Sequence, residues 1–371
     1  MANTLLTPQI IAMEALAILR NQFIFKDLVH TDYSNEFVKV GDTITVRKPA
    51  TLIAKDFAGS IATQDIQEQG VSVQLNRFKD VSVAITSKQE SLELKDFSKQ
   101  VIEPAMVALA QQIDEDIANF AFEKAQYQVD CGSATPTTLA DIANAGKQLD
   151  IAKAPLTERA IVLHPQHKYR YALTPNLSQV NFAGDNQTLR DALLGKIYNM
   201  NSYMGQNCPA STAAVSGTAK GTFKVASGST SGQVALSEMS GASVTVKIGD
   251  GFVYNGVLYR FTADGTASSN AIANIAVSPV FPSGITTPVL VRVVRFASSI
   301  AMHKNAFAFV MRPLDLPMGA ARAAVVNGEG MAVRVVYGYD QSSKTDTISF
   351  DILYGVAALR PENAVVLVDT Y

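Results

Sequence analysis

Few residues in this 371-residue chain have the types and the spacing that chemistry requires. His164 and His167 lie three positions apart, on either side of Pro165, and two imidazoles at this spacing can share a metal ion. No further histidine, cysteine or paired carboxylate lies close in the sequence to complete a metal shell. Cys131 and Cys208 are far apart and match no metal or redox motif, so we interpret both as free thiols. The sequence therefore predicts no metal site and no cofactor.

Motifs for nucleophilic catalysis and for phosphate binding are missing as well. The chain has no G-x-S-x-G elbow, and the glycine turns at 249–251 and 328–330 lack the lysine and the spacing of a phosphate-binding loop. His30 and His303 are isolated, so we interpret them as structural residues. The consecutive acidic residues 114–116 cannot all lie on one face of a helix, which predicts a solvated face. We therefore predict no catalytic residue and no enzymatic activity.

Composition points to contacts with other chains rather than to nucleic-acid recognition. Hydrophobic residues make up 47% and charged residues 17% of the chain, which favours large apolar contacts. The net charge of −2 and the scattered charges offer no basic patch, so any contact with DNA is expected to be sparse and independent of its sequence. No secretion signal is recognised at the N-terminus, and no apolar run approaches a membrane span. The length predicts two or three domains.

The remaining elements are organised around a long helix that is predicted over residues 96–127. Its apolar positions are three or four residues apart, which is the spacing of one buried helical stripe. The members of this predicted core stripe are Ile102, Met106, Leu109, Ile113, Ile117 and Phe120. A long helix that is apolar along one stripe needs a flat partner, and the strands predicted between residues 331 and 354 supply it.

Two segments before this helix have too little apolar sequence for a core of their own. Residues 8–30 predict an amphipathic helix that must dock elsewhere, and the alternating runs around residues 41–42 predict a hairpin. The polar stretch 48–80 predicts a long two-stranded excursion, which is marginally stable without a neighbour. In an enzyme it would be a lid, and in an assembly it would lie across the next subunit. The candidate inter-subunit contacts are Lys55, Asp56, Arg77, Lys79 and Asp80.

The second half of the chain changes character twice. Helical and extended patterns over residues 136–208 predict a compact α+β layer. After Cys208 the residues become small and weakly charged, and short strands recur with glycine turns, including the hairpin signal Asn255-Gly256. This pattern predicts a small β-barrel or sandwich inserted over residues 209–288. Strands resume beyond residue 288, so the predicted class is α+β.

Five stretches of the sequence carry a resemblance, and they occur in the same order as in one family. They are MANTLLT with ALAIL (1–7 and 15–19), VGDTITVRKP (40–49), LGKIY (194–198), AMHKNAFAF with RPL (301–309 and 312–314), and FDILYGV with LRPE (350–356 and 359–362). Together they resemble the major capsid (coat) proteins of tailed double-stranded DNA bacteriophages, and specifically the subfamily of short-tailed phages with an inserted β-domain.

The resemblance implies the tailed-phage/herpesvirus-type capsid shell fold, which has an N-terminal arm, an extended loop, a peripheral domain with a long spine helix, and an axial domain. On this sequence it assigns the arm to 1–37, the extended loop with its base strands to 38–88, and the spine helix to 89–135. It assigns the axial domain to 136–208 and 289–330, on either side of the inserted domain at 209–288. Residues 331–371 would then supply the closing strands of the peripheral domain.

The same resemblance implies a structural virion protein that assembles into the hexamers and pentamers of an icosahedral capsid around double-stranded DNA. Its partners would be other copies of itself, a scaffolding protein, a portal and a decoration protein, with no membrane. Assembly would take place in the cytoplasm of a bacterial host. Two alternatives stay open at this point: an encapsulin-like compartment shell, which would hold a packaged enzyme instead of DNA, and a β-rich tail or adhesin protein, which would form trimers or fibres.

Overall fold

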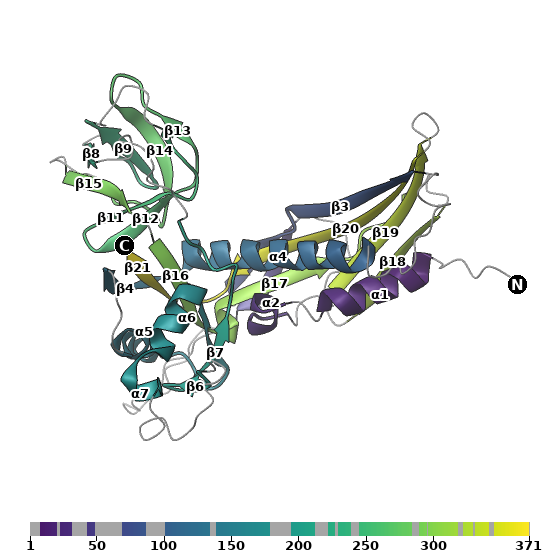
Figure 1. Cartoon of the computed structure of the whole chain (residues 1–371), viewed down its shortest axis with the longest axis horizontal. Coiled ribbons are helices and arrows are strands. Elements are labelled where there is room, and N and C mark those ends of the chain that lie inside the picture. The colour runs from purple at the N-terminus through teal and green to yellow at the C-terminus, as the bar shows by residue number, and fades with distance from the viewer. Residues whose placement is uncertain are drawn as a thin grey trace, which may run out of the picture. The chain divides into compact units, whose positions relative to one another are not determined.

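The computed structural model describes the chain in stretches that belong to two compact units. These stretches are residues 8–20, 23–31, 43–48, 69–86, 101–133, 139–178, 194–211, 222–226, 229–238, 245–283, 289–294, 296–317, 322–328, 331–340 and 345–370. Unit 1 comprises Met1–Ile117 and Asn305–Arg360, and unit 2 comprises Ala118–Lys304 and Pro361–Tyr371. Figure 1 labels their helices and strands.

The sheet of unit 1 is antiparallel and is built around one long strand. Its described strands are β18 (Arg322–Gly328), β19 (Met331–Asp340), β20 (Thr345–Ala358), β17 (Phe307–Arg312) and β3 (Arg77–Thr86). β20 pairs with β3 from Thr345 to Tyr354, with β19 on its other side, and with β17 toward its end. Every second side chain of β20 from Ile348 to Tyr354 is buried, as expected for a strand with one face on a core.

A separate antiparallel pair precedes this sheet and reaches back to it. The pair consists of β1 (Thr43–Lys48) and β2 (Gln69–Gln74). Gly355 of β20 passes so close to the carbonyl of Gln74 that any side chain at this position would overlap that carbonyl. Only glycine leaves room for such a close backbone approach.

The N-terminal helix of unit 1 docks on the sheet of its own chain. α1 (Pro8–Arg20) packs on β18 and β19. Its buried residues are Ile11, Ala12, Ala15 and Leu19. After the short helix α2 (Phe25–Leu28), His30 extends the sheet, because its amide donates to the carbonyl of Phe307 at 3.0 Å and its carbonyl accepts from the amide of Phe309 at 2.9 Å. The segment predicted to need a partner therefore finds one within unit 1.

The long helix α4 runs from Glu103 to Lys124, and so ends before the predicted boundary at residue 127. Tyr127 instead begins strand β4, and residues 96–100 lie outside the described stretches. Five members of the predicted stripe, from Ile102 to Ile117, are buried, whereas Phe120 is only half-buried. Burial continues at Ala121 and Phe122, because the partners of the helix change along its length. Phe122 packs with Phe296 and Val366 of unit 2.

Unit 2 contains a mixed sheet with helices on it. Across the described residues its strand order is β4 (Tyr127–Ser133), β21 (Ala364–Thr370), β16 (Phe296–His303), β5 (Arg159–Leu163), β7 (Met200–Met204) and β6 (Lys196–Ile197). The associated helices are α5 (Ala140–Ile151), α6 (Pro165–Ala172) and the short α7 (Pro175–Ser178). Ile142 and Leu149 of α5 and Tyr171 of α6 pack against Ile161 and Leu367 of the sheet. Residues 179–193, which belong to the predicted α+β layer, lie outside the described residues.

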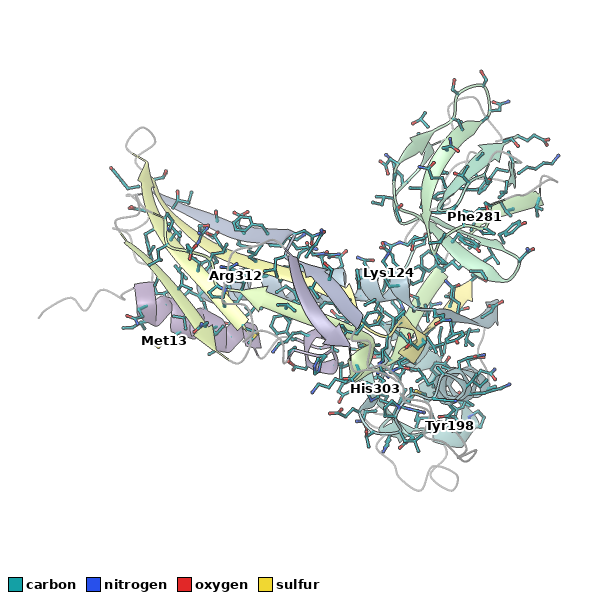
Figure 2. The ribbon with its side chains drawn as sticks, turned by 180° about the vertical axis from the view of Figure 1, so that it is seen from behind. Met13, Lys124, Tyr198, Phe281, His303 and Arg312 are labelled. Carbon is teal, nitrogen blue, oxygen red and sulfur yellow. The ribbon has the colours of Figure 1, made fainter. Side chains whose placement is uncertain are left out.

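Unit 2 also contains a closed antiparallel barrel. Its described strands follow the order β11 (Gly251–Tyr254), β12 (Val257–Phe261), β14 (Ile272–Ser278), β9 (Gln233–Ser237), β8 (Thr222–Val225) and β15 (Val289–Val294). The strands β10 (Thr245–Val246) and β13 (Gly265–Thr266) pair beside it. Aromatic side chains fill the barrel, with Phe252 in ring contact with Phe223, Phe261 and Phe281, the last of which Figure 2 labels.

The barrel is joined to the mixed sheet by specific contacts. The side-chain amide of Gln128 in β4 donates to the carbonyl of Leu258 at 3.2 Å, and its oxygen accepts from the amide of the same residue at 3.1 Å. Arg260 donates to Asn119 of α4 at 2.6 Å. Removal of the barrel would therefore expose polar and apolar side chains of the rest of unit 2 that the barrel now covers.

Three predicted domain boundaries differ from the arrangement of the strands. The barrel closes through β15, so the predicted end at residue 288 falls one strand short. β17 and β18, which were assigned to the axial return at 289–330, pair with β20 and β19 of unit 1. The last strand, β21, was assigned to the peripheral domain but pairs with β16 and β4 of unit 2. Each of these boundaries is set by pairing between strands that are distant in the sequence, which the local sequence pattern does not show.

Candidate functional site

The predicted inter-subunit residues fall into two groups. Lys55 and Asp56 lie outside the described residues. Arg77, Lys79 and Asp80 lie at the start of β3, where Asp80 is exposed and accepts a hydrogen bond from Ser82 at 3.0 Å. The side chains of Arg77 and Lys79 turn to the opposite face of the strand, because side chains alternate along it. There they meet α4 of the same chain.

Asp116 of α4 is the centre of a polar cluster in unit 1. Its Oδ2 lies 2.9 Å from Arg77 and 3.5 Å from Nζ of Lys79, and it accepts a hydrogen bond of 2.6 Å from the hydroxyl of Tyr354. Burial acts to raise the pKa of Asp116, but the Tyr354 hydrogen bond and the two cations outweigh it and hold that pKa below its usual range. The cluster ties the start of β3 and the middle of β20 to the helix.

Asp114 lies two residues before Asp116, on another face of α4, and is buried. Its side chain is 2% exposed, and its Oδ2 accepts a hydrogen bond from the amide of Ile24 at 2.9 Å. Burial raises the pKa of Asp114 to about 6, against the backbone hydrogen bonds from residues 24–26, which lower it. The prediction that residues 114–116 form a solvated face was therefore wrong for Asp114 and Asp116. Segment 23–31 covers this side of the helix, and helical periodicity alone does not show it.

The two neighbouring histidines belong to a buried cluster in unit 2. Nδ1 of His167 lies 2.6 Å from Oγ of Ser299 in β16, and the same oxygen accepts from the amide of His164 at 3.0 Å. Either partner can donate in the contact between His167 and Ser299, because the hydroxyl oxygen has a second lone pair and the direction depends on the tautomer of the ring. Nε2 of His167 lies 3.8 Å from Oδ2 of Asp369. Arg170 forms an ion pair with the same carboxylate.

Burial sets the protonation of this cluster. It lowers the pKa of His167 to about 3, with smaller contributions from His164 and Arg170, so the ring is neutral. Burial also raises the pKa of Asp369, although Arg170 opposes the shift. The order Ser299, His167, Asp369 matches that of a nucleophile triad, but these three side chains are fully buried and present no atom to an external substrate. Within the described part of the chain, no group of three or more His, Cys, Asp or Glu is placed to hold a metal ion.

Both cysteines are buried free thiols, as predicted. Burial, together with the charge of Asp141, raises the pKa of Cys131 to about 12, so this thiol is protonated and unreactive at neutral pH. Sγ of Cys208 lies 3.8 Å from the carbonyl of Val162. Neither residue is arranged for redox chemistry. Among the described helices, none is long and apolar enough to cross a membrane.

Comparison with solved structures shows which known proteins share this fold. No model of a protein family matches the sequence, and no curated protein matches it. A solved structure of Mycobacterium phage Che8 matches at a TM-score of 0.55 with 16% identity, covering 93% of this chain and 91% of the other. The capsid structure of the cyanophage P-SCSP1u matches at a TM-score of 0.52 with 13% identity, covering 94% and 88% of the two chains. The α+β capsid shell fold predicted from the sequence is thereby confirmed, and this chain has the fold of tailed-phage capsid structures.

Proposed function

We propose that this protein is a structural capsid protein whose copies assemble into a closed icosahedral shell. The observation that supports this most is the extent of the structural match, because about nine tenths of this chain and of each capsid structure correspond. A match of this extent covers most of the chain rather than one shared motif. The polar clusters of the described residues are consistent with a structural role, since each links secondary-structure elements and the triad-like one is buried.

The finer proposal is a shell of hexamers and pentamers around double-stranded DNA, of the short-tailed-phage type. A scaffolding protein, a portal and a decoration protein would act with it, and assembly would take place in the cytoplasm of the host. A net charge of −2 supports contacts with the DNA that are few and independent of its sequence. The polar sequence of residues 49–68, with Lys55 and Asp56, supports a loop that lies over a neighbouring subunit.

Electron microscopy of the purified protein tests the proposal. Closed shells of uniform size are the expected result, and a sample of monomers or fibres would contradict it. Shells purified from cells expressing the phage genes should protect long DNA from nuclease, whereas a packaged enzyme without DNA would identify a compartment shell. A variant with residues 49–68 replaced by a short Gly-Ser linker should give folded subunits but no shells. Normal shells from this variant would contradict the loop contact but not the shell function.

A further inference from the structure

One part of unit 2 exposes three large apolar side chains. Ile151 at the end of α5 is 59% exposed, Leu156 in the loop after it is 63% exposed, and Tyr198 in the β6–β7 turn is 53% exposed. Together they present roughly 300–400 Å² of apolar surface, which is the size of the largest patch that a soluble monomer usually exposes. Patches of this size often mark an interaction site.

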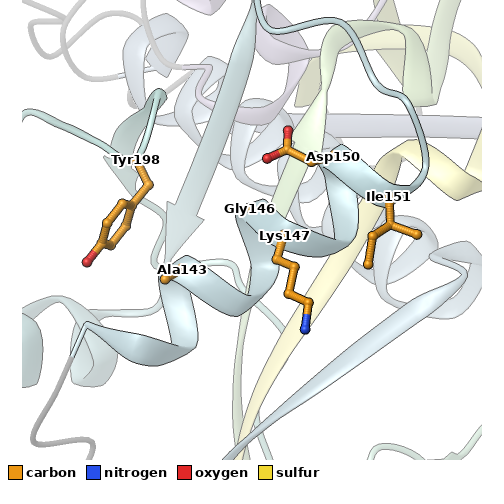
Figure 3. A pocket seen from close by; sticks show the side chains of 6 residues that line it. All are labelled: Ala143, Gly146, Lys147, Asp150, Ile151 and Tyr198. Carbon is orange, nitrogen blue, oxygen red and sulfur yellow. The ribbon is translucent and has the colours of Figure 1, made fainter.

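A hollow opens beside these side chains, with a volume of about 580 Å³. Its lining residues are Ala143, Gly146, Lys147, Asp150 and Ile151 of α5, and Tyr198. Figure 3 shows the ring of Tyr198 on one side of the hollow and α5 on the other. The small residues Ala143 and Gly146 leave the helix surface open between the Tyr198 ring and the Asp150 carboxylate. The groove is therefore shaped to receive a side chain from outside the subunit.

The walls of this groove are held in place before any partner arrives. Nδ2 of Asn199 donates to the carbonyl of Leu156 at 2.7 Å, which joins the turn to the loop. Asp150 forms an ion pair of 2.7 Å with Arg159, whose buried guanidinium also donates to the carbonyls of Ala154 and Pro155. A preformed site loses less conformational freedom on binding, which favours affinity.

The backbone at Tyr198 is strained, although the side chain is exposed. Its φ is +44° and that of Asn199 is +64°, so both central residues of the turn are left-handed. Asparagine tolerates this conformation, but tyrosine does so at a steric cost. About half of the Tyr198 residue is exposed, so only part of it packs within the subunit. Strain of this kind is typical of positions that are used for recognition.

The charges around the groove indicate what its partner carries. Asp150 is already neutralised by Arg159, whereas Lys147 has no ion-pair partner among the described residues. The groove thus combines apolar walls with one available cation, which suits an apolar side chain next to a carboxylate. The patch covers less than half of the ~800 Å² that each partner buries in a stable interface, so it serves as part of a larger contact. Such partial contacts are what repeated copies in a shell make with several neighbours.

We propose that this groove between α5 and the β6–β7 turn is a contact site for a second copy of the chain, which inserts an apolar side chain against Tyr198 and Ile151 and places a carboxylate at Lys147. This proposal rests on the proposed shell function. It names a surface and a pair of complementary groups that the function by itself does not specify.

Two substitutions can remove the groove without harming the subunit. Tyr198→Asn suits the left-handed turn better than tyrosine, and Ile151→Lys puts a cation at a helix C-terminus, where the helix dipole favours it. Both variants should melt at or above the temperature of the wild-type subunit, yet their yield of closed shells should fall roughly tenfold or more. Ile248→Lys is the matched control, because Ile248 is 65% exposed on the barrel, and it should assemble as the wild type does.

A direct measurement does not depend on the variants folding. Shells assembled from mixed isotope-labelled and unlabelled subunits are treated with a zero-length amine-to-carboxyl cross-linker, and the linked peptides are identified by mass spectrometry. A mixed-label link from Lys147 to a carboxylate is expected. Normal assembly of both groove variants, an equal loss in the Ile248→Lys control, or absence of the mixed-label link in shells would overturn the contact site. Absence of shells from the wild type would instead overturn the proposed function.

Discussion

Asp116 in unit 1 and Asp369 in unit 2 show how the supply of donors decides the state of a buried carboxylate. Asp116 has a side chain that is 16% exposed and receives Arg77, Lys79 and the hydroxyl of Tyr354. The side chain of Asp369 is fully buried, and its Oδ1 has no hydrogen bond to any described residue. The pKa of Asp116 is accordingly lowered and that of Asp369 is raised.

The difference teaches that the two clusters stabilise the fold in different ways. Around Asp116, the hydrogen bond and the two cations stabilise the charged carboxylate by more than partial burial destabilises it. This cluster links three elements. Around Asp369, the carboxylate depends on Arg170, and the neighbouring His167 keeps its Nε2 without a hydrogen-bond partner among the described residues. A buried ion pair of this kind adds little net stability, but removal of one partner is costly because the other charge stays buried.

The largest effect is expected from Arg170→Ala. This substitution leaves the Asp369 carboxylate buried without its cation, so the free energy of unfolding should fall by about 3–5 kcal/mol. Chemical denaturation monitored by circular dichroism measures it. The double variant Arg170→Ala/Asp369→Asn is the control and should recover part of the loss, because no buried charge remains. Equal stability of the single and double variants would show that Asp369 does not depend on this ion pair.

An intermediate effect is expected from acid. The pKa of His167 is about 3 in the folded protein and 6.5 when exposed, so the unfolded chain binds more protons and stability falls as the pH drops below 6.5. By pH 5 the loss should reach roughly 2 kcal/mol. The raised pKa values of Asp369 and Asp114 act in the opposite direction, because folding takes up protons there. The effect of the histidine is therefore read as the difference between wild type and His167→Gln.

For that comparison, melting temperatures are recorded from pH 8 to pH 5. The wild type should lose more stability than His167→Gln over this range, whereas parallel curves would mean that the ring is not held neutral by burial.

The smallest effect is expected from Asp116→Asn. Arg77 and Lys79 have side chains that are 29% and 35% exposed, so water can solvate both cations once the carboxylate is gone. The asparagine oxygen still accepts from Tyr354. The free energy of unfolding should therefore fall by only about 0.5–1.5 kcal/mol. Asp116→Ala also removes the acceptor for the buried Tyr354 hydroxyl, so the free energy of unfolding should fall further. Equal losses in the two variants would mean that the Tyr354 hydrogen bond does not contribute to stability.

Hydrophobic periodicity was sufficient to predict the main helical stripe, but it did not predict which residues the elements pack against. The stripe from Ile102 to Ile117 follows from spacing alone, and its burial agrees with that spacing. Phe120 was wrongly included in the stripe, and the buried Phe122 was missed. The last turns of α4 contact Phe296 and Val366 of unit 2, which spacing alone does not show. The capsid fold followed from the order of five short stretches, which is information that single-residue propensities do not contain.

The polar clusters could not be predicted, for a physical reason. Ser299, His167 and Asp369 are widely separated in sequence and meet only because β16 pairs with β21 and α6 covers that sheet. The segment that covers Asp114 lies 90 residues away in the sequence, so local spacing does not identify its partner. Only the sequence pair His164 and His167 hinted at the second cluster. A general signal would be a charged residue on a helix face that otherwise reads as apolar.

The pairing of β3 with β20 also sets the order in which the chain can fold during its synthesis. Thr86 pairs with Thr345, so the sheet of unit 1 stays incomplete until β20 has left the ribosome. The barrel, in contrast, is complete once Val294 has emerged. Loop closure makes distant pairing slow, so the barrel is expected to fold first while β3 waits with both edges open. A nascent chain in that state depends on prompt completion, or on a chaperone, to avoid pairing with another copy.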